Sequence, residues 1–211
     1  MEAVKFWFPI AISALLSVVC HPALRAGTAA DALQARLVSL DGLVAKFTQQ
    51  ITDAKGYVLE EATGTLHLAK PHFRWQIEAP FAQIILAKGD HVQIYDPDLE
   101  QVTERDIDGA IDQAPLALLT RSELALDEHF VVDESQIDSG YSRYILRPTS
   151  DDALFERLEL VFKHQQLDTL AIYDHAGQQT LIRFTEYADA QVIQSSMFEL
   201  DYPPGTDFVR G

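Results

Sequence analysis

Cysteine and positive charge are both scarce in this chain. Its 211 residues include a single cysteine, Cys20, so no disulfide can form within the chain and stability has to come from packing. Lysine and arginine number 16 against 32 aspartates and glutamates, which gives a formal net charge of −16. With no basic stripe to neutralise phosphates, this charge argues against nucleic acid and against an anionic membrane surface as partners. It favours a soluble, self-repelling monomer.

Sequence motifs of catalysis and metal binding are absent as well. There is no G-x-S-x-G, no H-E-x-x-H and no phosphate-binding glycine loop, and the seven histidines are scattered singly. Asp96, Asp98 and Glu100 alternate, and residues 106–109 resemble part of a calcium loop. Neither segment has the full ligand set of an EF-hand. We therefore expect a protein that is not an enzyme and that uses no metal and no cofactor.

The N-terminus differs from the rest of the chain. The uncharged segment Phe6–Cys20, "FWFPIAISALLSVVC", is shorter than the roughly 20 residues that a membrane-spanning helix needs. Lys5 precedes it and the small residues of "ALRAGTAADA" follow it. This pattern predicts a secretory signal peptide over residues 1–28, cut between Ala26 and Ala30, followed by one domain over residues 29–211. An uncleaved N-terminal anchor is the alternative.

Cys20 decides whether the signal belongs to a lipoprotein. A lipoprotein signal has a small residue directly before its cysteine, whereas Val19 here is branched and bulky. Cys20 is therefore interpreted as part of the discarded signal, which leaves the mature chain without cysteine.

One amphipathic helix is predicted at the start of the mature chain. In "DALQARLVSLDGLV", Leu33, Leu37, Leu40 and Val44 recur at helical spacing, and Asp31 can cap the helix start. A second helical segment, or two short ones, is predicted over residues 108–122, with Pro115 near a start.

Most of the remaining chain has the pattern of short strands. Apolar residues alternate with polar ones, and turn-forming residues such as Asp174–Gly177 separate the segments. The strand candidates after residue 43 include "TGTLHLAK", "AQIILAK", "HVQIYD", "LEQVTER", "EHFVVDES", "YSRYILRP", "FERLELVFK", "LDTLAIYD", "QTLIRFTEYAD" and "MFELDYPPG". The predicted fold is mainly β with short helices (α+β): about ten strands in one antiparallel sheet that curls, with the helices covering its concave face.

One strand candidate raises a question of function. Between Pro71 and Pro80, in "PHFRWQIEAP", Phe73, Trp75 and Ile77 share one face. From the pattern alone this face packs in an ordinary core or lines a site that an apolar ligand enters.

The order of motifs along the chain resembles the LolA family, the periplasmic lipoprotein carriers of Gram-negative bacteria. The resemblance runs from about Asp31 to the C-terminus. It rests on "LDGLVAKFTQQITDAKGYVLEEATGTLHLAKPHFRWQIEAP", "IYDPDLEQV", the segment Pro115–Leu119, "LELVFK", "LDTLAIYDHAGQQTLIRF" and "FELDYPPGTDF".

The resemblance implies an open half-barrel closed by a helical lid, with a hydrophobic cavity that takes the acyl chains of outer-membrane lipoproteins. It also implies an inner-membrane ABC transporter that loads the carrier and an outer-membrane acceptor, LolB, that unloads it. The residues implied to line the cavity are Leu33, Leu37, Leu40, Phe47, Phe73, Trp75, Ile77, Leu116, Leu118 and Leu119.

One position departs from the family pattern. The family usually has an arginine before the proline that opens this strand, where it bonds the lid, but this sequence has Lys70 before Pro71. Lysine lacks the planar fork of arginine, so Lys70 is a candidate for the lid latch in a weaker form.

Three other functions remain open from the sequence. A LolB-type acceptor would be anchored through Cys20, which Val19 disfavours. A lipid hydrolase would need a nucleophile or metal constellation, and a lipid-sensing domain of the same fold usually comes with further domains.

Overall fold

A computed structural model of the chain describes residues 28–89, 91–106, 115–121, 124–188 and 193–210; for residues 115–117 it describes the backbone alone. Residues 1–27 of the predicted signal peptide and residues 107–109 of the second calcium candidate therefore lie outside the described residues.

Twelve strands form a single sheet, in the order β12-β6-β5-β4-β3-β2-β1-β11-β10-β9-β8-β7. All neighbouring strands pair antiparallel except β12, which runs parallel to β6. The strands are β1 (Leu43–Thr52), β2 (Val58–Ala69), β3 (His72–Ala79), β4 (Gln83–Lys88), β5 (His91–Asp96), β6 (Gln101–Asp106), β7 (Phe130–Asp138), β8 (Tyr141–Pro148), β9 (Arg157–Lys163), β10 (Gln166–Tyr173), β11 (Gln179–Ala188) and β12 (Asp207–Arg210). This confirms the predicted mainly β fold, with two more strands than expected and one parallel pair.

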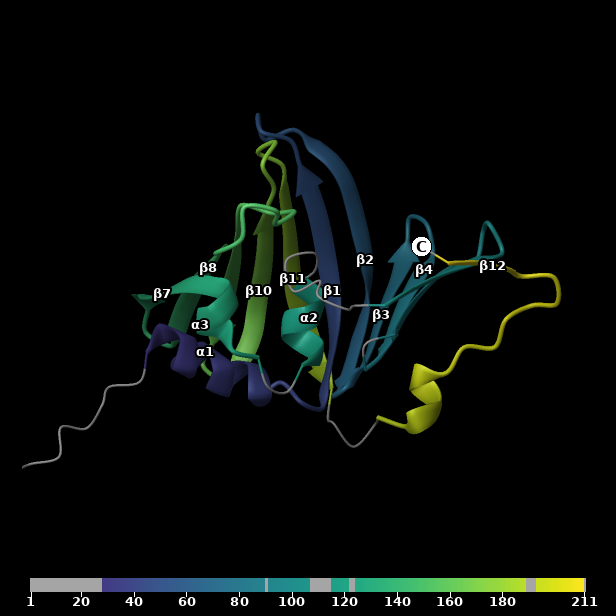
Figure 1. Ribbon diagram of the computed structural model, residues 1–211, viewed down its shortest axis with the longest axis horizontal. Coiled ribbons are helices and arrows are strands. Elements are labelled where there is room, and N and C mark those ends of the chain that lie inside the picture. Colours follow the sequence, from purple (N-terminus) through teal and green to yellow (C-terminus); the bar gives the residue numbers. More distant parts are fainter. Residues whose placement is uncertain (1–27, 90, 107–114, 122–123, 189–192, 211) are drawn as a thin grey trace, which may run out of the picture.

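The sheet curls without closing, because β7 and β12 remain at its two edges. Helices α1 (Ala29–Val38), α2 (Pro115–Thr120) and α3 (Leu126–His129) lie on the concave side of the sheet (Figure 1). The architecture is thus a curled sheet with helices over its concave face, as the sequence pattern predicted, and it forms the open half-barrel that the family resemblance implied.

Helix α1 begins earlier than the sequence suggested. Thr28, and not Asp31, is the N-cap: its side chain accepts a hydrogen bond from the Asp31 amide, and the Asp31 carboxylate accepts one from the Thr28 amide. This reciprocal pair satisfies two amide groups that a helix start would otherwise leave without partners. Leu33 and Leu37 are buried in the helix, and Leu40 is buried in the turn that follows.

Two segments differ from the prediction. The segment "MFELDYPPG" is not a strand: its first two residues end the 3₁₀ helix η3 (Ser195–Phe198), and the last strand, β12, comes after its prolines, which have no amide hydrogen to give to a sheet. Helix α3 was not predicted, because four residues carry too little periodicity to detect.

The C-terminal segment, residues 193–210, covers part of the outer face of the sheet. It buries Leu86, Tyr95 and Val102, which point away from the concave side. Tyr202 packs edge-on against Tyr95, with ring centroids 5.3 Å apart, and its hydroxyl donates to Gln93 at 3.0 Å. The protein therefore has its main core inside the curl and a second, smaller cluster outside it.

Candidate functional site

An aromatic cluster lies at the centre of the concave face. The rings of Phe47 on β1 and Trp75 on β3 stack with centroids 3.8 Å apart and planes 24° apart. Phe73 lies 6.2 Å from Trp75 in a nearly parallel plane, and Phe184 on β11 meets Trp75 edge-on at 6.2 Å. Three aromatic residues that were expected in the cavity thus form one continuous apolar surface with Phe184, which was not expected there.

A glycine allows this contact across an intervening strand. Gly64 on β2 is the register partner of both Phe47 and Ile77. A Cβ atom at Gly64 would lie 2.7 Å from the Phe47 ring and 1.9 Å from the Gln76 carbonyl oxygen, closer than real atoms approach. Glycine inside a strand often marks such a close approach. The glycine in "TGT" therefore indicated this contact in the sequence, although the alternation of apolar residues did not.

Leucines from the helices and the turn after α1 cover the aromatic cluster. Nearly all the residues implied to line a cavity meet in one hydrophobic core: Leu33, Leu37, Leu40, Phe47, Phe73, Trp75, Leu118 and Leu119 are buried in it, and Ile77 packs against it partly buried. The Leu116 side chain lies outside the described residues. The structure thus brings the described members of the set together, with helices on one side and aromatic strands on the other.

Lys70 joins the ends of two helices on this covering layer. Its ammonium nitrogen donates to the carbonyl oxygen of Leu37, in the last turn of α1, at 2.7 Å. It also donates to the carbonyl oxygen of Arg121, directly after α2, at 3.3 Å. Burial lowers the pKa of Lys70 from its ordinary value, and the nearby carboxylate of Asp41 opposes that shift. A charged donor therefore meets carbonyl groups at the negative ends of two helices.

Arg74 lies nearby in sequence but serves the other face of the sheet, as strand alternation predicted. Its guanidinium donates to the carbonyl oxygen of Met197 at 2.9 Å and to the side chain of Gln76. Burial lowers its pKa. Arg74 thus binds the C-terminal segment on the outer face, whereas Lys70 binds the helix ends on the inner face.

A second polar anchor, which the sequence did not suggest, comes from α1 itself. Arg36 donates to the hydroxyl of Tyr144 at 3.1 Å, to the hydroxyl of Ser142 at 3.3 Å and to the carbonyl oxygen of His164. Its guanidinium carbon lies 5.2 Å from the ring centroid of Phe162, which is fully buried. Arg36 therefore fixes α1 to β8 and to the turn after β9.

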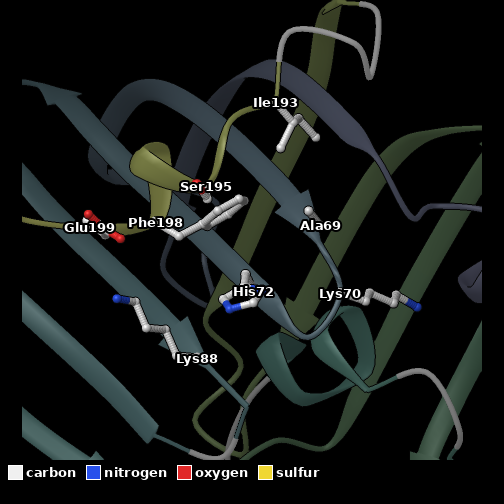
Figure 2. Close-up of a pocket in the computed structure, with 8 residues that line it drawn as sticks. All are labelled: Ala69, Lys70, His72, Lys88, Ile193, Ser195, Phe198 and Glu199. Atoms are coloured by element: carbon white, nitrogen blue, oxygen red, sulfur yellow. The ribbon is translucent and has the colours of Figure 1, made fainter.

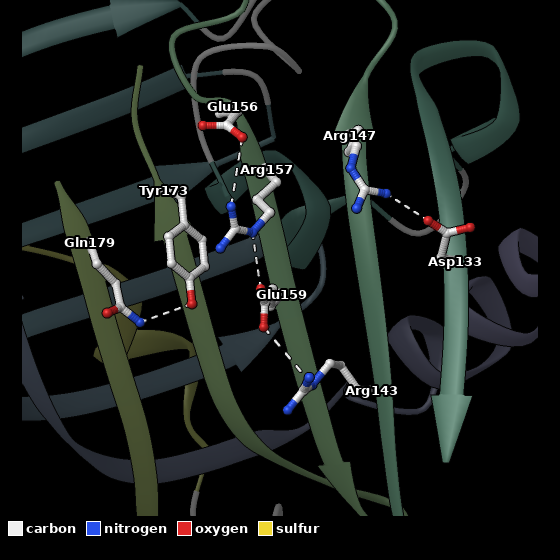
Figure 3. Close-up of polar contacts among 8 residues, drawn as sticks. All are labelled: Asp133, Arg143, Arg147, Glu156, Arg157, Glu159, Tyr173 and Gln179. Carbon is white, nitrogen blue, oxygen red and sulfur yellow. Dashed lines mark hydrogen bonds and ion pairs between the residues drawn. The ribbon is translucent and has the colours of Figure 1, made fainter. Parts of the chain in front are cut away.

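The outer face of β7, β8 and β9 carries paired charges. Arg147 lies 2.6 Å from Asp133, and Glu159 contacts Arg157 at 3.0 Å and Arg143 at 3.9 Å (Figure 3). These residues alternate with core residues such as Tyr144 and Leu158 and so point away from the helices. Surface pairs of this kind contribute little to stability, and we assign this face no site.

The described part of the chain shows neither a metal site nor a membrane-spanning helix. No group of three or more His, Cys, Asp or Glu side chains there could hold a metal ion, and none of its helices is long and apolar enough to cross a membrane. Asp96, from the first calcium candidate, instead accepts hydrogen bonds from the amides of Asp98 and Leu99 and caps a turn.

The sequence of this chain is similar to that of known proteins. The model of the family "Outer membrane lipoprotein carrier protein LolA" matches residues 38–201. The chain belongs to the LolA family.

Two relatives show how far this similarity extends. A protein from Chromohalobacter salexigens is 38% identical over 206 residues, 97% of either chain. One from Hahella chejuensis is 37% identical over 182 residues, 85% of this chain and 87% of its own. Both are named outer-membrane lipoprotein carrier protein. A solved structure from Thermus thermophilus shares the fold, with a TM-score of 0.56 at 14% identity, covering 87% of this chain and all of its own.

The LolA match includes the aromatic strands and Lys70 but almost none of α1.

The attachment of α1 by Arg36 can be tested directly. We expect Arg36→Met to lower the free energy of unfolding by about 1.5–3 kcal/mol, the range for hydrogen bonds from a charged donor. Urea unfolding measures this loss, and hydrogen exchange should show weakened protection of the α1 amides. The matched control is Arg183→Met, at an exposed position on β11; equal effects of both changes would contradict the anchor.

Proposed function

We propose that this protein carries outer-membrane lipoproteins through the periplasm of a Gram-negative bacterium, shielding their acyl chains between the sheet and the helices. Membership of the LolA family and the names of its relatives support this function. The structural observation that carries the proposal is the stack of Phe47 and Trp75 beneath leucine-bearing helices.

The physical reason for such a carrier is the free energy of exposing acyl chains to water. Each methylene contributes about 0.8 kcal/mol on burial. Two or three long chains therefore approach or exceed the roughly 20 kcal/mol at which non-covalent affinities saturate. Such a cargo cannot be released into water, so it passes directly from one apolar site to the next.

We further propose the two partners that this route requires. An inner-membrane lipoprotein-releasing ABC transporter loads the carrier with the energy of ATP, and the outer-membrane acceptor LolB receives the cargo. The carrier's own site has to bind with moderate strength, because a deeper site would retain the cargo. The protein performs no chemistry in this scheme and works as a monomer.

The most direct experiment on this function identifies what the protein carries. The mature chain is purified from periplasm without detergent, and the co-purified species are analysed by mass spectrometry. We expect triacylated lipoproteins to co-purify with the protein, in a molar amount that equals the fraction of carrier molecules holding cargo. A preparation that contains free lipids only would favour a different lipid-binding function.

The aromatic surface generates the first functional prediction. We expect Trp75→Asp to weaken binding of an apolar fluorescent probe at least about tenfold, because a carboxylate is strongly disfavoured in an apolar site. Lipoprotein should displace the probe from the unmodified protein. Leu99→Asp, at a turn position that is 69% exposed, is the matched control. A folded Trp75→Asp protein that binds the probe as well as this control would rule out a lipid site on this face.

Lys70 is proposed as the latch that keeps the empty lid shut. Its bonds to the carbonyls of Leu37 and Arg121 span the ends of α1 and α2, so losing them favours the open state. A hydrogen bond from a charged donor contributes about 1.5–3 kcal/mol, enough to shift an open–shut equilibrium roughly tenfold or more.

We expect Lys70→Arg to close the empty lid more tightly, because the guanidinium offers parallel donors. Lys70→Leu should admit cargo but slow its release, because leucine cannot donate the hydrogen bonds that stabilise the closed, empty state. Transfer between purified donor and acceptor membranes measures both effects. Onward transfer by Lys70→Leu at the native rate would show that the closing contact lies elsewhere.

Processing of the N-terminus provides a further prediction. We propose a mature chain that begins between Gly27 and Asp31. A start at or before Thr28 keeps the N-cap of α1, and loss of such a cap typically weakens a helix by about 1 kcal/mol. N-terminal sequencing of the periplasmic protein checks the cleavage site. A lipid-modified Cys20 would instead favour an anchored, LolB-type acceptor.

A further inference from the structure

A pocket opens on the outer face of the sheet, on the side opposite the aromatic cluster. Its volume is about 360 Å³, and it lies between the β2–β3 turn, strand β4 and the C-terminal segment (Figure 2). Ala69, Ile193 and Phe198 provide its apolar wall, and His72, Lys88 and Glu199 are the ionisable residues around them. His72 and Lys88 are register partners on β3 and β4.

The pocket is a built feature, because several contacts fix its outer wall. Phe198 is buried, and its ring centroid lies 5.4 Å from that of His72. The bond from Arg74 to the Met197 carbonyl holds η3 against β3. The volume falls within the range of roughly 300–1,000 Å³ that is usual for ligand pockets.

The charge around this pocket is opposite in sign to the net charge of the whole protein. The chain has twice as many acidic as basic residues, yet the side chains that face this pocket include Lys88 and His72, and Glu199 is its single acidic lining residue. Arg74 adds a further positive charge on the same strand as His72. A carboxylate that approaches here meets local attraction, whereas most of the surface repels it.

We propose that this pocket is a docking site for a partner protein, and that the partner presents an acidic side chain next to an apolar one. The apolar side chain would rest on Phe198, and the carboxylate would pair with Lys88. This inference rests on the proposed carrier function, because a carrier that hands over its cargo directly has to dock on its donor and acceptor. An anionic membrane is the weaker candidate, since the net charge of −16 opposes approach to such a surface.

The position of the pocket connects docking with the lid. Lys70 belongs to the pocket wall, while Figure 2 shows its side chain turned away from the other lining residues. Its ammonium holds the ends of α1 and α2 on the inner side. A partner that shifts the β2–β3 turn therefore acts on the residue that joins the helix ends.

Charge reversal and pocket filling test the docking site. Lys88→Glu reverses the basic rim, and Ser195→Trp fills the pocket without a change of charge. The matched controls are Lys55→Glu, at the exposed β1–β2 hairpin, and Ser196→Trp, an exposed neighbour outside the pocket lining. All four proteins are assayed for loading from inner-membrane vesicles, for delivery to outer-membrane vesicles and for binding of the apolar probe.

We expect each pocket variant to slow loading or delivery about fivefold or more relative to its control, with probe affinity unchanged. The defect of Lys88→Glu should shrink at high salt, because screening weakens the exposed charge contacts that it disturbs. Equal transfer by variants and controls overturns the docking site, and so does a loss of transfer that follows a loss of probe affinity. Relief of the defect in vesicles freed of anionic lipid would point to the membrane instead. If the native protein moves no lipoprotein, the carrier function fails first, and this outcome is distinct from a failure of the pocket alone.

Discussion

An open sheet with an apolar concave face constrains everything else in this protein. Twelve strands curl but leave two edges, so the inner surface around Phe47 and Trp75 cannot be covered by the sheet itself. Helices with leucine faces cover it. Apolar surface contributes about 25 cal/mol for each Å² removed from water, so either helices or an apolar ligand has to occupy this face. Exchange between these two covers is the physical basis of a carrier.

Polar side chains fix two of the three helices of this cover, α1 and α2. Arg36 ties α1 to β8 and to the turn after β9 through several donors and a buried aromatic ring. Lys70 donates to the carbonyl oxygen of Arg121, directly after α2, at 3.3 Å, and Leu118 and Leu119 of α2 pack in the core. Polar contacts at the ends of α1 and α2 therefore add to the leucine packing that holds both helices on the concave face.

Strand alternation and leucine spacing predicted the curled sheet and the helices on its concave face, and the resemblance to the LolA family implied the half-barrel and the apolar residues that the structure brings together. The contacts that the sequence could not predict join distant segments. Arg36 reaches Tyr144 across 108 residues, and Arg74 binds a carbonyl in a segment wrongly predicted as a strand. Local patterns carry no information on such pairs. Gly64 was visible in the sequence, but its meaning depends on Phe47 and Gln76 on the neighbouring strands.

Tryptophan fluorescence tests the central claim most directly. The chain has two tryptophans, and Trp7 lies in the predicted signal peptide, so Trp75 is the single tryptophan expected in the mature protein. A lipoprotein carrying brominated acyl chains quenches a tryptophan only when the chains come into contact with it. Acyl chains that enter beneath the helices should quench Trp75 strongly on binding, while a lipoprotein with ordinary chains should not. Stoichiometric binding of the brominated lipoprotein with unquenched Trp75 emission would contradict the account, because the acyl chains would then lie somewhere other than the concave face.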